Sequence, residues 1–195
     1  PVRFISNESS GKQGYTIAEK LSSLGAHTTL ISGPTKLPDP NVDKVVHVSS
    51  ADEMMFECDK ALPVNIAICA AAVADYKVAK QSEAKIKKNG SRLDITLEEN
   101  PDILSRLSKR NDKRPDLVVG FAAETEKLEE NSKIKLEKKG CDWILGNNVS
   151  NGQVIGKDTN EIHFISKSET ENWKQMRKEE VAEKLSHKIV QHLKS

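Results

Sequence analysis

The chain has 195 residues, of which 36% are hydrophobic, 4% aromatic and 30% charged, and its 30 Lys and Arg against 29 Asp and Glu leave a formal net charge of +1. This balance excludes a strongly basic protein that coats nucleic acid, and the few aromatic residues argue against a platform that stacks single strands. The longest apolar run, residues 66–74, is about half as long as a membrane span requires. We therefore expect one soluble domain over residues 1–195, with no nucleic-acid and no membrane partner.

The cysteines and histidines do not form a metal-binding pattern. Cys58, Cys69 and Cys141 contain no CxxC pair, and the 5 histidines contain no HxH or HExxH pair. We therefore expect no metal ligands among the side chains. No basic, apolar signal-like segment opens the sequence, so we expect a cytoplasmic protein.

The first part of the chain alternates predicted helices and strands. Apolar side chains at helical spacing predict a helix over residues 14–24, and β-rich stretches predict strands over 28–32 and 45–48. A capping box at residues 50–53 predicts a helix that runs towards Leu62. Residues 64–70 are almost wholly apolar, as is typical of a parallel strand that is covered on both faces.

A basic hairpin interrupts this alternation. Residues 85–88 and 93–97 flank Asn89-Gly90, a pair that favours a type I′ turn, so we expect a projecting hairpin. Residues 77–92 carry six Lys or Arg against one Glu, a local balance of +5. Such a run is either a solvated face or a basic flap beside a phosphate site.

The rest of the chain returns to the α/β pattern. Asn100 is the predicted N-cap of a helix whose first residue is Pro101. Strands are expected over residues 117–121, 142–145 and 161–166, helices over 125–139 and 178–193, and a loop over 147–160. The sequence therefore predicts a Rossmann-like, doubly wound α/β fold with a mostly parallel sheet. Ligands of such sheets bind at the carboxyl ends of the strands, here the loops at 6–14, 69–76 and 120–125.

Each of these loops contains candidate binding residues. Ser9, Ser10 and Gly11 precede a helix and form either a phosphate cradle or merely a flexible start of the helix. The loop is not a Walker A motif, and Ser9 stands where a GxGxxG fingerprint needs glycine. The apolar strand that contains Cys69 ends in Ala70, Ala71 and Ala72, which leave room for a flat ligand or pack under a helix.

Three further side chains have two interpretations each. Asp75 either accepts hydrogen bonds from a sugar hydroxyl or base amine, or caps a helix. Phe121 either stacks on a base or belongs to the core. Lys135 and Lys139, one helical turn apart, either form a positive edge or pair with the glutamates of their own helix.

Taken in order, five segments resemble the signatures of phosphopantothenate-cysteine ligase, bacterial type. They are residues 2–7 with 9–12, 71–76 (AAVADY), 85–88 (KIKK), 100–104 (NPDIL) and 120–125 (GFAAET). The resemblance implies a reaction in coenzyme A biosynthesis in which phosphopantothenate, L-cysteine and CTP react through an acyl-CMP intermediate, with Mg²⁺ as cofactor. CTP is expected rather than ATP. It also implies a homodimer in which the basic hairpin acts as dimerisation element and flap.

The resemblance also implies residue roles. Asn7 and Lys85 correspond to catalytic positions, Asn7 at the acyl group and Lys85 on the triphosphate. Arg3 and Ala72, together with Asn7, correspond to substrate-binding positions. The positions that correspond to nucleotide binding are Ser9, Ser10, Gly11, Cys69, Ala70, Ala71, Asp75, Lys85, Pro101, Asp102, Ile103, Leu104, Phe121, Lys135 and Lys139.

The chain departs from the family at its start. Family members begin with a strand that ends in a Gly-Gly-Thr turn, so the resemblance implies that this single nucleotide-binding ligase domain lacks the first strand. The bacterial form is also fused behind a flavin-dependent decarboxylase, for which 195 residues leave no room. Two rival interpretations are an NAD(P)-dependent Rossmann oxidoreductase, which requires a complete GxGxxG, and a non-catalytic nucleotide-binding module.

Overall fold

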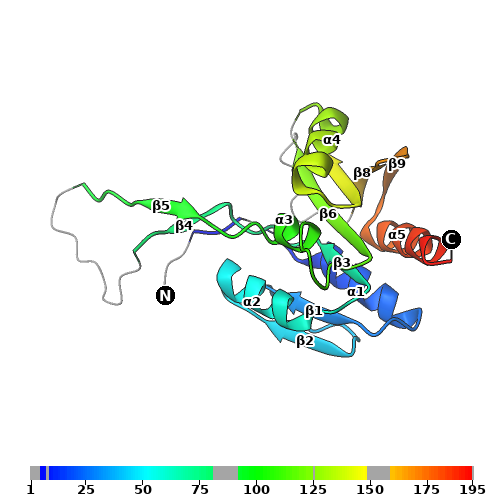
Figure 1. Ribbon diagram of the computed structural model, residues 1–195, viewed down its shortest axis with the longest axis horizontal. Coiled ribbons are helices and arrows are strands. Elements are labelled where there is room, and N and C mark those ends of the chain that lie inside the picture. The colour runs from blue at the N-terminus through cyan, green and yellow to red at the C-terminus, as the bar shows by residue number, and fades with distance from the viewer. Residues whose placement is uncertain (1–4, 8, 81–91, 125, 149–158, 195) are drawn as a thin grey trace.

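The computed structural model describes residues 5–7, 9–80, 92–124, 126–148 and 159–194 (Figure 1). Its helices are α1 (Lys12–Ser23), α2 (Ala51–Ala61), α3 (Ile103–Ser108), α4 (Leu128–Lys139) and α5 (Lys178–His192). Its strands are β1 (Thr29–Ser32), β2 (Lys44–His47), β3 (Ile66–Cys69), β4 (Tyr76–Val78), β5 (Leu97–Glu99), β6 (Leu117–Glu124), β7 (Trp143–Asn148), β8 (Thr159–Ser166) and β9 (Thr170–Arg177). No helix in these ranges has the length and apolar character that a bilayer span requires.

The central sheet has the strand order β3-β6-β7-β8-β9. β3, β6 and β7 are parallel, and β8 and β9 extend the sheet in antiparallel fashion. β1 and β2 form a separate parallel pair. The predicted fold class is thus confirmed, but the sequence did not predict β9. This strand buries Trp173 and is otherwise exposed or half-buried, so its residues lack the apolar alternation that indicates a strand.

Helices cover both faces of the central sheet. From β6, Leu117 and Val119 belong to one core cluster with side chains of α1 and α5, while Val118 and Ala122 belong to another with Leu136 of α4. Successive residues of a strand point to opposite faces, so an apolar run is needed when both faces are covered. This arrangement explains the uninterrupted apolar sequence of β6 and confirms the doubly wound architecture.

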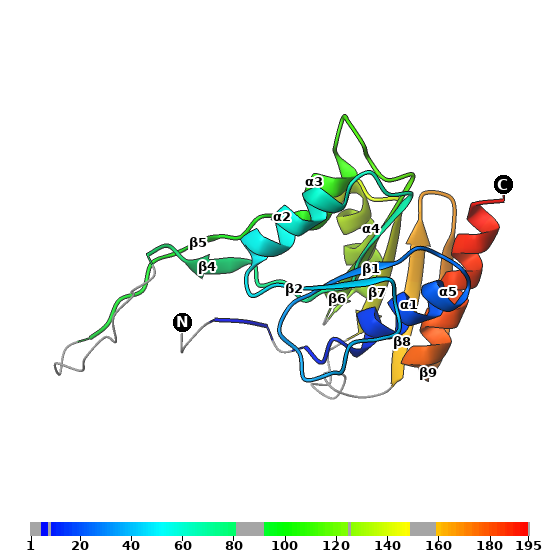
Figure 2. The ribbon, with the colours of Figure 1, turned by 90° about the horizontal axis from the view of Figure 1, so that it is seen from below.

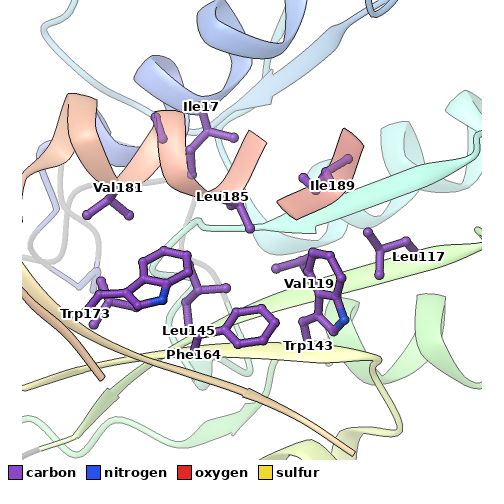
Figure 3. Packing of buried hydrophobic residues seen from close by; sticks show 12 residues of the cluster. Ile17, Leu117, Val119, Trp143, Leu145, Phe164, Trp173, Val181, Leu185 and Ile189 are labelled. Atoms are coloured by element: carbon purple, nitrogen blue, oxygen red, sulfur yellow. The ribbon is translucent and has the colours of Figure 1, made fainter. Parts of the chain in front are cut away.

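Aromatic rings fill the core between the sheet and α5 (Figure 3). Phe164 lies 5.2 Å from Trp143 in an edge-to-face arrangement and stacks on Trp173 at 5.7 Å, measured between ring centroids. Val181, Leu185 and Ile189 of α5 are buried against them. This is the most completely buried part of the described chain, and it holds the central sheet in place.

A third cluster lies beneath α2, and it is less completely buried. Met54 and Met55 of α2 pack with Ile103 and Leu107 of α3. In β3, Ile66 and Ile68 pack against the cluster of α1 and α5, and Ala67 and Cys69 pack against the cluster of α2 and α3, so both faces of this strand are covered, as predicted. Its residues are nevertheless only half-buried, because β3 pairs with β6 along one edge and has no partner strand on the other edge among the described residues.

β4 and β5 form an arm that projects from the body (Figures 1 and 2). Tyr76 pairs with Glu99, and Val78 with Leu97, in an antiparallel ladder. The predicted turn at residues 89–90 and the strand at 85–88 lie outside the described residues. The strand predicted over 93–97 was wrong except at its last residue, because residues 92–96 have no ladder of their own.

Helix ends agree with the sequence patterns in part. Ser50 caps α2 by accepting a hydrogen bond from the Glu53 amide, as predicted. Gly140 ends α4 at φ 73°, a conformation that glycine adopts without strain. Asn100 is not the cap of α3, however, because Asp102 accepts the hydrogen bond from the Ser105 amide instead.

Candidate functional site

The loops at the carboxyl ends of β3 and β6, the loop before α1 and the start of α3 lie along one open cleft of about 4050 Å³, which also extends past β1, β2, α2 and the arm. Among the predicted site residues, those that line it are Asn7, Ser9, Gly11, Cys69, Ala70, Ala71, Ala72, Asp75, Pro101, Asp102, Ile103, Leu104, Phe121, Lys135 and Lys139. Ser10 is adjacent but is not part of the lining. Arg3 and Lys85 lie outside the described residues.

The loop before α1 presents a helix N-terminus to the cleft. Its N-cap residue Gly11 has φ 74°, and the first turn of α1 contains no acidic residue. Thr35 stabilises the loop, because its hydroxyl donates a hydrogen bond to the Ser10 carbonyl at 3.1 Å. Backbone amides at such a helix end attract anions. The geometry is therefore compatible with a phosphate cradle. The sequence patterns did not indicate that Thr35 would hold this loop.

Two asparagines hold the loop after β3. The Asn7 side-chain amide donates to the Val73 carbonyl at 3.2 Å, across 66 residues of sequence. Asn100 binds the same loop twice, with its side chain on the Ala74 carbonyl and its backbone amide on the Asp75 carbonyl, both at 2.8 Å. The structure thus brings Asn7 next to the predicted substrate-binding segment, and it gives Asn100 a role that its sequence pattern did not indicate.

Asp75 presents an exposed carboxylate to the cleft. β4 begins at the next residue, so Asp75 does not cap a helix and that interpretation was wrong. No side chain in the described part of the chain forms a hydrogen bond or ion pair with its carboxylate. Asp75 can therefore accept hydrogen bonds from a hydroxyl or amine of a bound ligand.

Two glycines, one in β6 and one in β7, let α3 and α4 pack close to the central sheet. A Cβ atom at Gly120 of β6 would lie 2.5 Å from Leu104 Cδ2 of α3, and one at Gly146 of β7 would lie 2.4 Å from Ser132 Oγ of α4. Both distances are shorter than van der Waals contact allows. The glycines therefore set how closely α3 and α4 pack, and so where Lys135 and Lys139 lie.

Both predicted lysines of α4 form ion pairs with carboxylates of other elements. Lys135 Nζ lies 2.6 Å from Glu124 Oε1 at the end of β6, and Lys139 Nζ lies 2.5 Å from Asp102 Oδ2 at the start of α3. Pairing with the glutamates of their own helix, the alternative interpretation, was therefore wrong. Burial acts to raise the pKa of Asp102, but hydrogen bonds from Lys139 and the Ser105 amide outweigh it and lower the pKa.

Phe121 and Cys69 form apolar parts of the wall. Phe121 packs against the core cluster, which confirms that interpretation of the ring, and it also lines the cleft, where stacking on a base stays a prediction. Burial raises the pKa of the Cys69 thiol to about 12. The thiol therefore stays protonated at neutral pH, where it is a poor nucleophile, and Cys69 contributes shape rather than reactivity.

Residues 1–193 match the family model described as the DNA/pantothenate metabolism flavoprotein C-terminal domain. The chain belongs to this family. It is 41% identical over 192 residues to the coenzyme A biosynthesis bifunctional protein CoaBC of Haemophilus influenzae, a match that covers 98% of this chain and 48% of the relative. The CoaBC protein of Escherichia coli strain K12 is 44% identical over 170 residues, covering 85% and 42%. The chain thus spans about half the length of the curated relatives that it matches.

Solved structures share the fold. The crystal structure of the C-terminal domain of a coenzyme A biosynthesis bifunctional protein CoaBC has a TM-score of 0.82 at 35% identity and covers 100% of this chain and 88% of its own. A Cab2 mutant in complex with phosphopantothenate-cysteine has a TM-score of 0.74 at 16% identity and covers 100% of this chain and 83% of its own. The second likeness shows the fold alone.

Proposed function

We propose that this chain is a phosphopantothenate-cysteine ligase domain that acts in coenzyme A biosynthesis and uses CTP. The observation that carries the proposal is the common cleft, in which Asn7 and the segment around Ala72 meet the predicted nucleotide-binding residues of β3, α3, β6 and α4. Membership of the family and the names of the CoaBC relatives support it.

The proposed reaction has two steps. The carboxylate oxygen of phosphopantothenate attacks the α-phosphorus of CTP, so that the bond to the β-phosphate breaks and pyrophosphate leaves. The cysteine amine then attacks the acyl carbonyl of the acyl-CMP, CMP leaves, the amide bond forms and the amine loses a proton. The side-chain amide of Asn7 has two N–H donors, of which one is directed at Val73. The other is available for the carbonyl oxygen as it gains negative charge.

Positive groups in the cleft would offset the charge of the triphosphate. Lys135, Lys139 and the N-terminus of α1 line it, and the resemblance places Lys85 on the triphosphate as well. Such groups stabilise charge that moves towards the leaving pyrophosphate.

Mg²⁺ is the proposed cofactor, and it would reach the cleft bound to the triphosphate. The ranges that the structure describes contain no group of three or more His, Cys, Asp or Glu side chains that could hold a metal ion. This fits Mg²⁺, which is commonly held by substrate phosphates and only one or two carboxylates. Asp75 and Glu99 both line the cleft and have no side-chain partner among the described residues, and Asp75, on the loop after β3, is the one that we propose as protein ligand. The ion would neutralise phosphate charge and orient the α-phosphate for attack.

The arm supports the proposal of a homodimer. Leu93, Ile95 and Leu97 are spaced by two residues, and between 44% and 59% of each is exposed. An isolated two-stranded ribbon is marginally stable in water. A second copy of the arm would cover these side chains, so we expect a dimer in sedimentation analysis that Leu93→Asp combined with Leu97→Asp converts to monomer.

Two unpaired strand edges support the proposal of a further strand. β1 and β3 each have an unpaired edge among the described residues, and Leu30, Ile31, Ala67 and Ile68 line the cleft next to these edges. A parallel strand between β1 and β3 would satisfy both edges. We also propose a cytoplasmic location, because Cys58, Cys69 and Cys141 are free thiols, as expected in a reducing compartment.

A pyrophosphate-release assay on the full-length protein tests the function. We expect release only when CTP, phosphopantothenate and Mg²⁺ are all present, and we expect CMP and an amide product once cysteine is added. Release that does not depend on phosphopantothenate, or no release at all, would contradict the ligase. Replacing CTP with ATP in parallel reactions tests the nucleotide preference.

A further inference from the structure

Lys135 and Lys139 lie one turn apart on α4, but their carboxylate partners differ in exposure. Asp102, the partner of Lys139, has a side chain that is 45% exposed and itself lines the cleft. Glu124, the partner of Lys135, has a side chain that is only 14% exposed, and it does not line the cleft. Of the two carboxylates, only Asp102 therefore belongs to the cleft lining.

Glu124 is held at the end of β6 and has few alternatives to Lys135. Its Oε1 atom is buried and has no hydrogen-bond partner among the described residues, so the 2.6 Å contact with Lys135 is an ion pair without hydrogen-bond geometry. Its Oε2 atom accepts a long contact of 3.4 Å from the Asn131 side chain. A carboxylate that is mostly removed from water needs a nearby cation. Among the described residues, the Lys135 ammonium is the one cation that pairs with it.

The ion pair with Glu124 orients the Lys135 side chain. A lysine side chain is a flexible four-carbon stem that ends in a point charge, and ordering it on ligand binding costs conformational entropy. The Lys135 side chain is 41% exposed, so without Glu124 it would be free to move in the solvent. With Glu124, the ammonium stays at the end of β6, the strand whose Phe121 and Ala123 also line the cleft.

We propose that Glu124 is a positioning residue that holds Lys135 ready for the nucleoside triphosphate, and so contributes to nucleotide affinity although it does not touch the nucleotide. The inference rests on the proposed function, since it takes the ligand to be a nucleoside triphosphate. Two other roles make different predictions. If Glu124 acted only as a negative charge, its removal would strengthen the binding of the anion. If it only joined α4 to β6, its removal would affect binding whether or not Lys135 is present.

A double-mutant cycle on the full chain separates these roles. The variants are Glu124→Gln, which keeps the shape and removes the charge, Lys135→Met, which keeps the length and removes the ammonium, and both together. The control is Glu129→Gln, which removes a 2.6 Å ion pair to Lys133 on the same helix, outside the cleft lining. The measurements are the dissociation constant of CTP by titration calorimetry and the thermal midpoint of each variant.

We expect Glu124→Gln to weaken CTP binding roughly tenfold in the wild-type background, which is the effect expected when a well-placed charged contact is lost. In the Lys135→Met background, the same substitution should change CTP binding little. Glu129→Gln should leave the dissociation constant unchanged. Equal weakening in both backgrounds, unchanged binding or tighter binding by Glu124→Gln would overturn the inference. If Glu124→Gln does not fold, Glu124→Met, which keeps an unbranched side chain of similar length without charge, replaces it in the cycle. If the wild-type chain itself does not bind CTP, the proposed function fails, a result distinct from any of these.

Discussion

The two walls of the cleft are built very differently. The wall formed by α3 and α4 rests on β6 and β7, whose Val118 and Ile144 are fully buried, and its lysines are paired with carboxylates. The wall formed by the loop before α1 and by β3 is half-buried, its Asn7 is exposed, and β3 has an unpaired edge. The wall formed by α3 and α4 is thus held by a closely packed core and by ion pairs, whereas the wall near Asn7 is more open.

The largest expected difference between the two sides is in stability. Leu136 of α4 is buried in one cluster with Val118 of β6 and Ile144 of β7. Replacing it with alanine should lower the free energy of unfolding by about 2–5 kcal/mol, because a cavity remains in a tightly packed core. Ile68 of β3 is only half-buried, so Ile68→Ala should cost clearly less. Urea denaturation measures both variants, and equal costs would contradict a difference in packing.

A second prediction concerns the distance between α4 and the sheet. Gly146→Ala introduces a Cβ atom 2.4 Å from Ser132 Oγ and 3.0 Å from Leu128 Cδ1, so α4 must move. We expect a loss of about 1–3 kcal/mol in unfolding free energy, as is typical of overpacking. CTP binding should weaken as well, because Lys135 and Lys139 move with the helix. Gly33→Ala is the control for stability, since its nearest contact would be Met54 at 3.9 Å. An unchanged melting temperature in Gly146→Ala would show that α4 is not held closely.

The smallest expected effect is on the pH dependence of stability. The pKa of Asp102 is lowered in the folded state, so its ion pair with Lys139 stabilises the fold above the unfolded pKa of about 3.9, and this contribution is lost as the pH falls through the lower folded value. Asp102→Asn can still cap α3 but lacks the charge, so it should cost less than about 1 kcal/mol at neutral pH. The difference from wild type should vanish in strong acid. A difference that persists there would mean that charge is not its cause.

The sequence predicted much of the fold because the patterns that mattered were local. The apolar run of β6, the capping serine at position 50 and the glycine that ends α4 each act within a few residues of their own position. The strand β9 was missed because its partner β8, rather than its own sequence, determines it.

The candidate site was predicted less completely, since its contacts join distant segments. Nothing in the sequence near Asn100 shows that it binds the loop after β3 rather than capping a helix. Likewise, the helical spacing of Lys135 and Lys139 indicates a shared face, but not that Glu124 and Asp102 approach from β6 and α3. The resemblance to a family supplied the residue roles, and the structure shows which of the described residues meet in one cleft.

The central claim is that Asn7 and the nucleotide-binding residues of this cleft together make and consume an acyl-nucleotidylate. The most direct test is mass spectrometry of reactions that contain phosphopantothenate, CTP, Mg²⁺ and cysteine, with the wild-type protein and Asn7→Asp. We expect acyl-CMP to accumulate in Asn7→Asp, because its carboxylate repels the charge that develops on the carbonyl oxygen during transfer to cysteine. In Lys85→Gln, by contrast, formation of acyl-CMP should itself be slow. If Asn7→Asp contains no acyl-CMP while the wild type forms the amide product, the assignment of Asn7 and of this cleft is contradicted.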